Sequence, residues 1–259
     1  MSLDVPTTTA ALPGGGAIPL LGFGTWGLSG SSATSSVATA LEAGYRHLDT
    51  ATIYDNEAEV GAGLRSGGVP RDEVFVTTKC PPDKAGRARE VLEQSLEALG
   101  VDAVDLWLVH WPPAAPVPMW ESFVQARTDG AARDVGVSNF SLDQLDELER
   151  ATGVLPAVNQ CKWSPLIFDR SFLDGHRERG VVLEGYSGLK GGTLEHPVVT
   201  DIADRLGCTP AQVITRWHLD HEVVTIPKSA TPERIRSNAD LGSVRLSSDD
   251  LAALDGLGR

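Results

Sequence analysis

Residues 74–110, VFVTTKCPPDKAGRAREVLEQSLEALGVDAVDLWLVH, contain the two kinds of pattern that decide the fold. The stretch has short apolar runs at 74–76 and 104–109, which suit strands buried on both faces of a parallel sheet. Between them, Leu92, Leu96 and Leu99 are spaced i, i+4 and i+7, as on the apolar face of a helix. The stretch therefore predicts a strand, a helix and a second strand, which is a β–α–β unit.

The same alternation continues in both directions along the chain. Eight β–α units in 259 residues predict a single (β/α)8 TIM barrel over 1–259, an α/β fold, with a doubly wound sheet as the alternative. Ahead of the first unit, residues 7–18 predict an N-terminal β-hairpin. The other strands are expected at 21–24, 47–49, 135–137, 157–160, 181–183 and 223–226. Helix starts are expected at Ser141 with Gln144, at Thr209 with Gln212, and at Thr231 before Pro232.

Composition excludes several classes of protein. The formal net charge is −13, from 22 basic and 35 acidic residues, which argues against nucleic acid or an anionic membrane as a partner. The three cysteines form no disulfide framework and no apolar run approaches the ~18 residues of a membrane span, and we expect no signal peptide. We therefore expect a cytoplasmic protein, with a monomer as the default. Of the 22 basic residues only five are lysines, so each lysine is a noteworthy choice over arginine.

Polar side chains follow nearly all of the predicted strands. In a TIM barrel the carboxyl ends of the strands carry the active site, so this placement predicts a functional face. Polar groups also occur wherever a strand meets solvent, which is the structural alternative. The residues at these ends are Asp49, Lys79, His110, Ser138, Asn139, Asn159, Gln160, Tyr186, Lys228 and Ser229.

Seven short motifs occur in a fixed order from about residue 18 to residue 255. They are LGFGTW (21–26), EAGYRHLDTA (42–51), YDNE (54–57), VTTK (76–79), VHWP (109–112), GVSNF (136–140) and IPKS (226–229). In this order they resemble the aldo-keto reductase superfamily, in particular its bacterial members similar to 2,5-diketogluconate reductase. The resemblance implies a (β/α)8 barrel that binds a nicotinamide cofactor without a Rossmann domain. The GxGxxG string at 22–27 matches the Rossmann fingerprint by letters only, because no helix opens directly after it.

The resemblance implies four catalytic residues: Asp49, Tyr54, Lys79 and His110. Reduction of a carbonyl needs a proton for the oxygen, and a free tyrosine with a pKa around 10 is a reluctant acid. An ammonium ~4 Å away is worth about 4 kcal/mol at an effective dielectric near 20, roughly three pKa units, so Lys79 is expected to lower the pKa of Tyr54 and make it a usable acid. Asp49 would orient Lys79, and His110 would bind the carbonyl or relay a proton. An ion pair and a core histidine with purely structural roles are the alternative.

The cofactor residues are implied by the same resemblance. Ser138, Asn139 and Gln160 would bind the nicotinamide carboxamide, and Tyr186 would stack on the ring. Lys228, Ser229 and Arg234 match the contacts to the 2′-phosphate and favour NADPH, with a solvated basic patch as the alternative. Asn238 matches the adenine contact, although Ser237 replaces the glutamate frequent before it. Further cofactor contacts are expected from Gly24, Thr25, Ser187 and Leu189.

Substrate selection is expected to depend on short loops. The last predicted helix, 247–255, ends close to Arg259, so we expect a shortened C-terminal tail and no long lid. The glycine-rich segment 188–193 is expected to be mobile. We expect a wide mouth lined by Trp26, Tyr54, Trp111 and Trp163, unless Trp26 and Trp111 are packing residues.

The function that follows is NADPH-dependent reduction of a small-molecule aldehyde or ketone to an alcohol. The alternative is a non-catalytic sensor or regulatory protein that binds a nicotinamide cofactor on the same barrel. No metal site is expected, because His218 and His221 lack a third ligand at sensible spacing. The sequence leaves the substrate and the physiological direction open.

Overall fold

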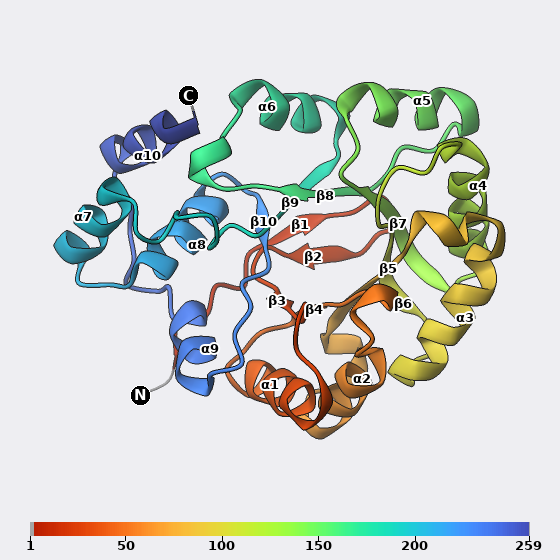
Figure 1. Ribbon diagram of the computed structural model, residues 1–259, viewed down its shortest axis with the longest axis horizontal. Coiled ribbons are helices and arrows are strands. Elements are labelled where there is room, and N and C mark those ends of the chain that lie inside the picture. Colours follow the sequence, from red (N-terminus) through yellow and green to blue (C-terminus); the bar gives the residue numbers. More distant parts are fainter. Residues whose placement is uncertain (1–2, 259) are drawn as a thin grey trace.

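The computed structural model describes residues 3–258 and has a closed parallel barrel at its centre (Figure 1). The circle closes where the Gly22 N–H donates to the Thr225 carbonyl and the Thr225 N–H donates to the Leu20 carbonyl, both at 2.8 Å. The predicted (β/α)8 barrel is confirmed, and the doubly wound alternative is wrong because an open sheet would leave two unpaired edges. The strands, in barrel order, are β3 (Phe23–Gly24), β4 (His47–Asp49), β5 (Phe75–Cys80), β6 (Val104–Val109), β7 (Ala132–Ser138), β8 (Val158–Lys162), β9 (Val182–Tyr186) and β10 (Val224–Thr225).

Helices surround the strands and cover their outer faces (Figure 1). Within the described residues, none is long and apolar enough to cross a membrane. The helices that alternate with the strands are α1 (Gly30–Glu42), α2 (Glu57–Ser66), α3 (Ala88–Leu99), α4 (Pro116–Thr128), α5 (Leu142–Thr152), α6 (Arg170–Arg179), α8 (Pro210–Asp220) and α9 (Pro232–Ala239). Two more are α7 (Pro197–Leu206), before α8, and α10 (Ser248–Asp255), after α9.

Two of the three predicted helix starts have the expected side-chain caps. The capping boxes at Ser141 on α5 and Thr209 on α8 are both formed. Helix α9 does begin after Thr231, but the Thr231 side chain makes no capping bond. Its backbone N–H instead donates to the Ser229 hydroxyl at 3.0 Å, which ties the β10–α9 loop together.

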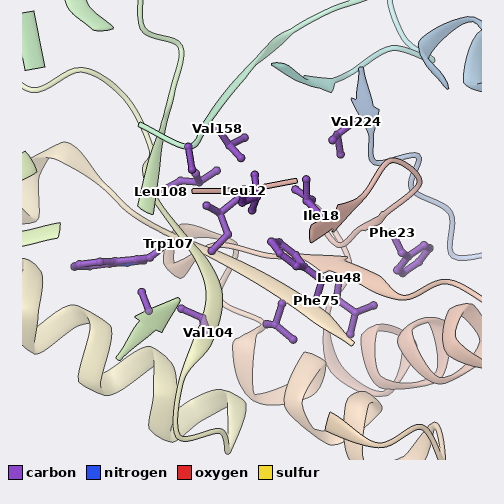
Figure 2. Packing of buried hydrophobic residues seen from close by; sticks show 14 of the residues in the cluster. Leu12, Ile18, Phe23, Leu48, Phe75, Val104, Trp107, Leu108, Val158 and Val224 are labelled. Carbon is purple, nitrogen blue, oxygen red and sulfur yellow. The ribbon is translucent and has the colours of Figure 1, made fainter. Parts of the chain in front are cut away.

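The N-terminal hairpin lies across one end of the barrel (Figure 1). It consists of β1 (Thr9–Ala11) and β2 (Ala17–Pro19), paired antiparallel. Leu12 and Ile18 are buried and point toward barrel side chains such as Leu108 and Val158 (Figure 2). At the turn, the Gly14 N–H donates to the Asp134 carboxylate at 2.7 Å. Because Asp134 lies in the first half of β7, the hairpin closes the amino-terminal end of the barrel and leaves the carboxyl ends of the strands open.

Candidate active site

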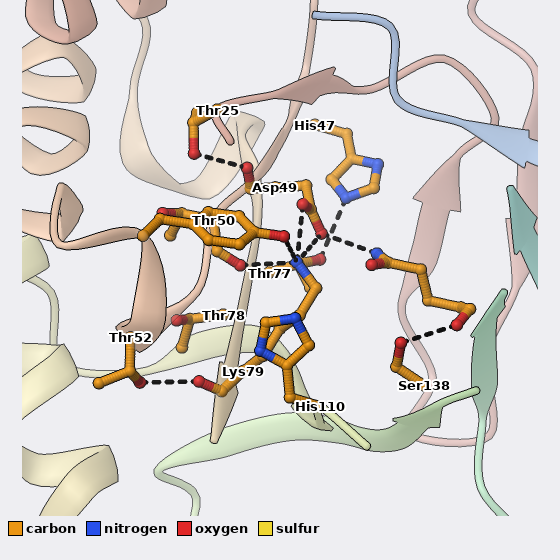
Figure 3. Close-up of polar contacts among 12 residues, drawn as sticks. Thr25, His47, Asp49, Thr50, Thr52, Thr77, Thr78, Lys79, His110 and Ser138 are labelled. Atoms are coloured by element: carbon orange, nitrogen blue, oxygen red, sulfur yellow. Dashed lines mark hydrogen bonds and ion pairs between the residues drawn. The ribbon is translucent and has the colours of Figure 1, made fainter. Parts of the chain in front are cut away.

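Side chains from three neighbouring strand ends meet around one lysine (Figure 3). The Lys79 ammonium donates to both oxygens of Asp49 at 2.7 Å and to the Thr50 carbonyl at 2.8 Å. It also lies 3.5 Å from the Tyr54 hydroxyl. Lys79 is 0% exposed, and burial alone would lower its pKa, but Asp49 and Tyr54 outweigh burial and the pKa is raised. The lysine is therefore a permanent buried cation in contact with a phenol.

Tyr54 ends the short 3-10 helix Thr52–Tyr54, which follows β4. The Thr52 hydroxyl donates to the Lys79 carbonyl at 2.7 Å and anchors this turn to β5. Burial raises the pKa of Tyr54, Lys79 opposes that rise and Asp49 supports it. The expected net lowering of the Tyr54 pKa is therefore wrong for the polypeptide alone, because desolvation exceeds the effect of Lys79. The phenol stays protonated at neutral pH and holds a proton that it can donate.

His110 follows β6 and faces Tyr54, with the ring centroids 5.8 Å apart in an edge-to-face arrangement. Burial, and then the charge of Lys79, lower its pKa to about 3. The imidazole is therefore neutral near pH 7, which favours a hydrogen-bonding role over the proton relay. Its Nδ1 has no hydrogen-bond partner within residues 3–258.

Amide and hydroxyl groups follow the next strands around the barrel. The Ser138 hydroxyl donates to the Gln160 carbonyl at 2.7 Å, and the Asn139 amide donates to Ser138 Oγ at 2.9 Å. The Tyr186 hydroxyl donates to Asn139 Oδ1 at 2.8 Å. Gln160 in turn donates to Asp49 Oδ2 at 2.8 Å, which joins this group to the lysine centre. The predicted carboxamide residues thus form one connected network with the predicted catalytic ones.

A single cavity of about 910 Å³ collects nearly all of the predicted site residues. Two exceptions are Lys79, which lies beneath the cavity floor, and Thr25, whose buried hydroxyl donates to the Asp49 carbonyl at 2.9 Å. Thr25 supports β4 from inside the barrel, so its predicted cofactor contact has no exposed side-chain atom behind it. The predicted residues that line the cavity are Gly24, Trp26, Asp49, Tyr54, His110, Trp111, Ser138, Asn139, Gln160, Tyr186, Ser187, Leu189, Lys228, Ser229, Arg234 and Asn238.

The far end of the cavity lies at the start of α9. Lys228 and Arg234 are exposed there, and neither forms an ion pair with a carboxylate of the described residues. Ser229 and Asn238 are largely buried beside them. Two free cations at a helix start form a site for an anion such as a phosphate.

The mouth of the cavity is aromatic, as expected, but with one residue fewer. Trp26 is 58% exposed and Trp111 is 48% exposed, so neither is a core packing residue. The expectation that Trp163 lines this mouth is wrong. Trp163 is buried against Phe168 and Trp217, at centroid distances of 5.6 and 6.4 Å, on the outer side of the barrel.

Sequence reasoning missed three residues of this region. Ile53 is 56% exposed and lines the cavity beside Tyr54. Lys190, in the loop expected to be mobile, places its ammonium 3.9 Å from the centroid of the Trp26 ring. Glu184, on β9, is buried in the barrel. The scarcity of lysine was a signal for Lys190, and a lone carboxyl inside an apolar strand was a signal for Glu184.

Two sequence patterns, the His218–His221 pair and the GxGxxG string at 22–27, have structural roles. The His218 ring bonds the Ile214 carbonyl, and His221 bonds Asp255 at 2.7 Å; the described residues contain no cluster suited to a metal ion. Gly22 and Gly24 allow the barrel to close. A Cβ at Gly22 would lie 2.5 Å from His47 Nδ1, and a Cβ at Gly24 would lie 2.7 Å from the Ile226 carbonyl oxygen.

Sequence comparison shows relatives that match almost the whole chain. The model of the aldo/keto reductase family matches residues 20–259. An aldo-keto reductase of Mycolicibacterium vanbaalenii is 43% identical over 97% of this chain and 94% of its own length. Morphine 6-dehydrogenase of Pseudomonas putida is 42% identical over 93% of this chain and 88% of its own length. Methylglyoxal reductase DkgA of Escherichia coli is 39% identical over 95% of this chain and 92% of its own length.

Solved structures agree with these relatives. The crystal structure of an aldo/keto reductase from Brucella melitensis superposes with a TM-score of 0.94 at 36% identity, over 99% of this chain and 100% of that one. A Bombyx mori aldo-keto reductase in complex with NADP has a TM-score of 0.90 at 30% identity, over 98% and 94%.

Proposed function

The chain belongs to the aldo/keto reductase family, and from this premise we propose that it reduces an aldehyde or ketone to an alcohol with NADPH and takes the proton from Tyr54. The family and its reductase-named relatives make the chain an NAD(P)H-dependent carbonyl reductase. The choice of NADPH, the role of each residue and the kind of substrate are inferred from the geometry of the cavity.

The cavity fits a dinucleotide cofactor in the chemistry of the residues at its two ends. It extends from Tyr54 and the Ser138–Asn139 amide cluster to the free cations Lys228 and Arg234. When bound, NADPH supplies the hydride from C4 of its nicotinamide ring. Asn139 and Gln160 would hold the carboxamide, and Tyr186 would support one face of the ring. Lys228 and Arg234 would hold the 2′-phosphate that distinguishes NADPH from NADH.

The observation that carries the proposal is the contact between the Lys79 ammonium and the Tyr54 hydroxyl. A phenol that gives its proton to a carbonyl oxygen develops negative charge, and a fixed cation stabilises that charge as it forms. Lys79 cannot turn away, because Asp49 and the Thr50 carbonyl hold it from the other side. Lys79 therefore supports the transition state without first ionising the phenol. His110, neutral beside Tyr54, would orient the carbonyl oxygen toward the phenol.

The mouth favours bulky and varied carbonyl compounds. Trp26, Ile53 and Trp111 are each about half exposed around the opening, so they offer apolar surface without enclosing a small substrate. The relatives named for morphine and for methylglyoxal differ greatly in substrate size, and the exposed mouth supports the larger class for this chain. Aromatic and polycyclic aldehydes and ketones are therefore the proposed substrates.

Substitution of the proton donor tests the proposal. In Tyr54→Phe, kcat/KM for a panel of aromatic carbonyls with NADPH should fall about 10³-fold, within the range known for general acids. Tyr45→Phe is the matched control, because Tyr45 is a buried tyrosine outside the cavity whose hydroxyl donates to the Ile235 carbonyl. If the wild-type protein binds NADPH but turns over no carbonyl, the sensor alternative replaces the proposal.

A further inference from the structure

A second carboxyl group lies inside the barrel below the cavity. Glu184 on β9 is 0% exposed, and neither of its side-chain oxygens has a well-formed hydrogen bond within residues 3–258, although the nearby Gln160 amide acts to lower its pKa. Its register partners are Gln160 on β8 and Val224 on β10, which carry no charge. A buried carboxyl without a cation or a well-formed hydrogen bond destabilises the fold, so its presence at this point of the barrel requires an explanation.

The charged groups that face Glu184 belong to the proposed proton-donating centre. Gln160, its neighbour across the β8–β9 ladder, donates to Asp49, and Asp49 holds Lys79. Lys79 contacts the Tyr54 hydroxyl, so Gln160, Asp49 and Lys79 connect the neighbourhood of Glu184 to the phenol. The charge of Glu184 acts on this centre, because it raises the pKa of Lys79 and the pKa of Tyr54.

The remaining titratable groups near this centre are neutral. Burial lowers the pKa of His47, on β4 beside Asp49, to about 3. His110 is neutral for the same reason, with a pKa of about 3. His218 packs against Gly185 rather than into the barrel, and burial lowers its pKa to about 4. The charge balance around Glu184 therefore involves only Asp49 and Lys79.

One cation cannot neutralise two carboxylates. With Asp49 ionised, Lys79 is already compensated, and a second carboxylate would give the closed interior a net charge of −1. Burial, and then the charge of Asp49, raise the pKa of Glu184 to about 8, against the opposing effects of Lys79 and of the Gln160 amide. Glu184 is therefore neutral around pH 7 and becomes negative above about pH 8.

We propose that Glu184 is a positioning residue for proton transfer: through the Asp49–Lys79 pair, the charge of its carboxyl sets how readily Tyr54 gives up its proton. The proposal rests on the role of Tyr54 in the proposed function. An ionised Glu184 opposes formation of the phenolate, so it keeps Tyr54 protonated as the pH rises. Carbonyl reduction, which needs the phenol, then persists to higher pH. Alcohol oxidation, which needs the phenolate as a base, begins at higher pH.

The pH profile of reduction separates this role from a structural one. Glu184→Gln preserves size and removes the ionisation, and Glu184→Met is the second variant if Gln does not fold. The alkaline limb of kcat for reduction should move to lower pH by about one unit, the scale of one nearby charge. Near pH 7 kcat should change little, because the wild-type carboxyl is neutral there. A limb that stays in place while kcat falls equally at every pH, or one that moves upward, overturns the proposal.

A spectroscopic readout keeps the inference independent of turnover. The absorbance of the Tyr54 phenolate is titrated in protein without cofactor, as the difference between each protein and its Tyr54→Phe counterpart. The phenolate midpoint should be lower in Glu184→Gln than in the wild type. A shifted midpoint in a protein that reduces no carbonyl would refute the proposed function and leave the coupling standing. An active enzyme whose phenolate midpoint is the same in Glu184→Gln and in the wild type would refute the coupling and leave the proposed function standing.

Asp134→Asn is the matched control for both measurements. Like Glu184, Asp134 is a buried barrel carboxyl whose pKa is raised mainly by burial. It lies at the opposite end of the barrel, where it accepts from the Gly14 N–H. Its substitution should leave the limb and the phenolate midpoint in place; if both move equally with Asp134→Asn, the effect of Glu184 is not specific and the proposal fails.

Discussion

The two ends of the barrel each contain a buried aspartate paired with cations, and the two arrangements differ in where the cation goes. At the amino-terminal end, Asp105 accepts from Arg133 and Arg71 at 2.8 Å and from the Val76 N–H at 2.9 Å. The side chains of Arg71 and Arg133 are 30% and 56% exposed, so their charge is shared with solvent. This network closes a surface, and pairs of this kind contribute little to stability beyond their hydrogen bonds.

At the carboxyl end, Asp49 is paired with Lys79, which has no exposed surface. Such a pair is costly to desolvate and gains little over an apolar pair, so stability alone does not account for it. The lysine also contacts Tyr54, a proton-bearing group at the floor of a cavity. Comparison of the two ends therefore supports the proposal that the Asp49–Lys79 pair serves chemistry, because its cation is removed from solvent and directed at a third group.

The backbone shows the same difference between the ends. Asp55, Asn139 and Ser187 have left-handed backbone angles, with φ of 54°, 65° and 58°, and all three follow elements at the cavity. The fourth such residue apart from glycine, Glu222, lies in the turn before β10 at the other end. Strain of this kind costs of order 1 kcal/mol per residue and tends to collect where function requires it.

The largest effect is expected when the carboxyl-end pair is broken. Lys79→Met should lower kcat/KM about 10³-fold and the free energy of unfolding by about 3–5 kcal/mol, because the Asp49 carboxylate would remain buried without a cation. In the double variant Asp49→Asn with Lys79→Met, most of the stability should return and the activity should not. Urea unfolding and steady-state kinetics measure the two quantities. Recovery of activity together with stability would show that the pair is merely structural.

The matching change at the amino-terminal end should have the opposite profile. Asp105→Asn removes the charge from three hydrogen bonds, and the free energy of unfolding should fall by about 2 kcal/mol. The kcat/KM for carbonyl reduction should stay unchanged, because no residue of this network reaches the cavity that contains Tyr54. A large loss of activity at full folding would contradict the division between the two ends.

Most of the fold and of the site geometry could be predicted from the sequence because both depend on local patterns. Apolar runs marked the strands, and the capping boxes at Ser141 and Thr209 formed as predicted. The polar residue at the end of a parallel strand must lie at the carboxyl edge, so Asp49 and His110 could be placed at the same edge of the barrel without knowledge of any contact.

The errors concern the direction of side chains and the pKa of one buried group, and both depend on distant parts of the chain. Trp163 follows β8, and only its packing against Phe168 and Trp217 shows that it points outward. Glu184 is in the barrel beside Gln160, whose partner Asp49 is 111 positions away in sequence. The Tyr54 pKa was misjudged because the effect of Lys79 was counted without the desolvation that accompanies it.

A smaller effect is expected at the exposed cations of the carboxyl end, and it should appear as a change in the preference for NADPH over NADH. Arg234→Ala should raise the KM for NADPH about tenfold to 150-fold and leave the KM for NADH nearly unchanged, since one charge-assisted phosphate contact is worth about 1.5–3 kcal/mol. Arg236→Ala is the control on the same helix, because Arg236 faces Glu42 at 3.9 Å and is absent from the cavity lining. Equal changes for both cofactors would place Arg234 outside the 2′-phosphate site.

The smallest effect concerns the contact between Lys190 and Trp26 across the mouth. A cation over an exposed indole is worth about 0.5–1 kcal/mol, so Lys190→Met should change the KM for a bulky carbonyl only about twofold to fivefold. Lys190→Arg should preserve the wild-type value, because a guanidinium also stacks on indole. Tryptophan fluorescence, with Trp26→Phe as the reference, reports the contact directly. If Lys190→Met leaves both the fluorescence and the KM unchanged, the contact between Lys190 and Trp26 does not form in solution. Lys190 would then differ from Lys79 in having no third group that its charge acts on.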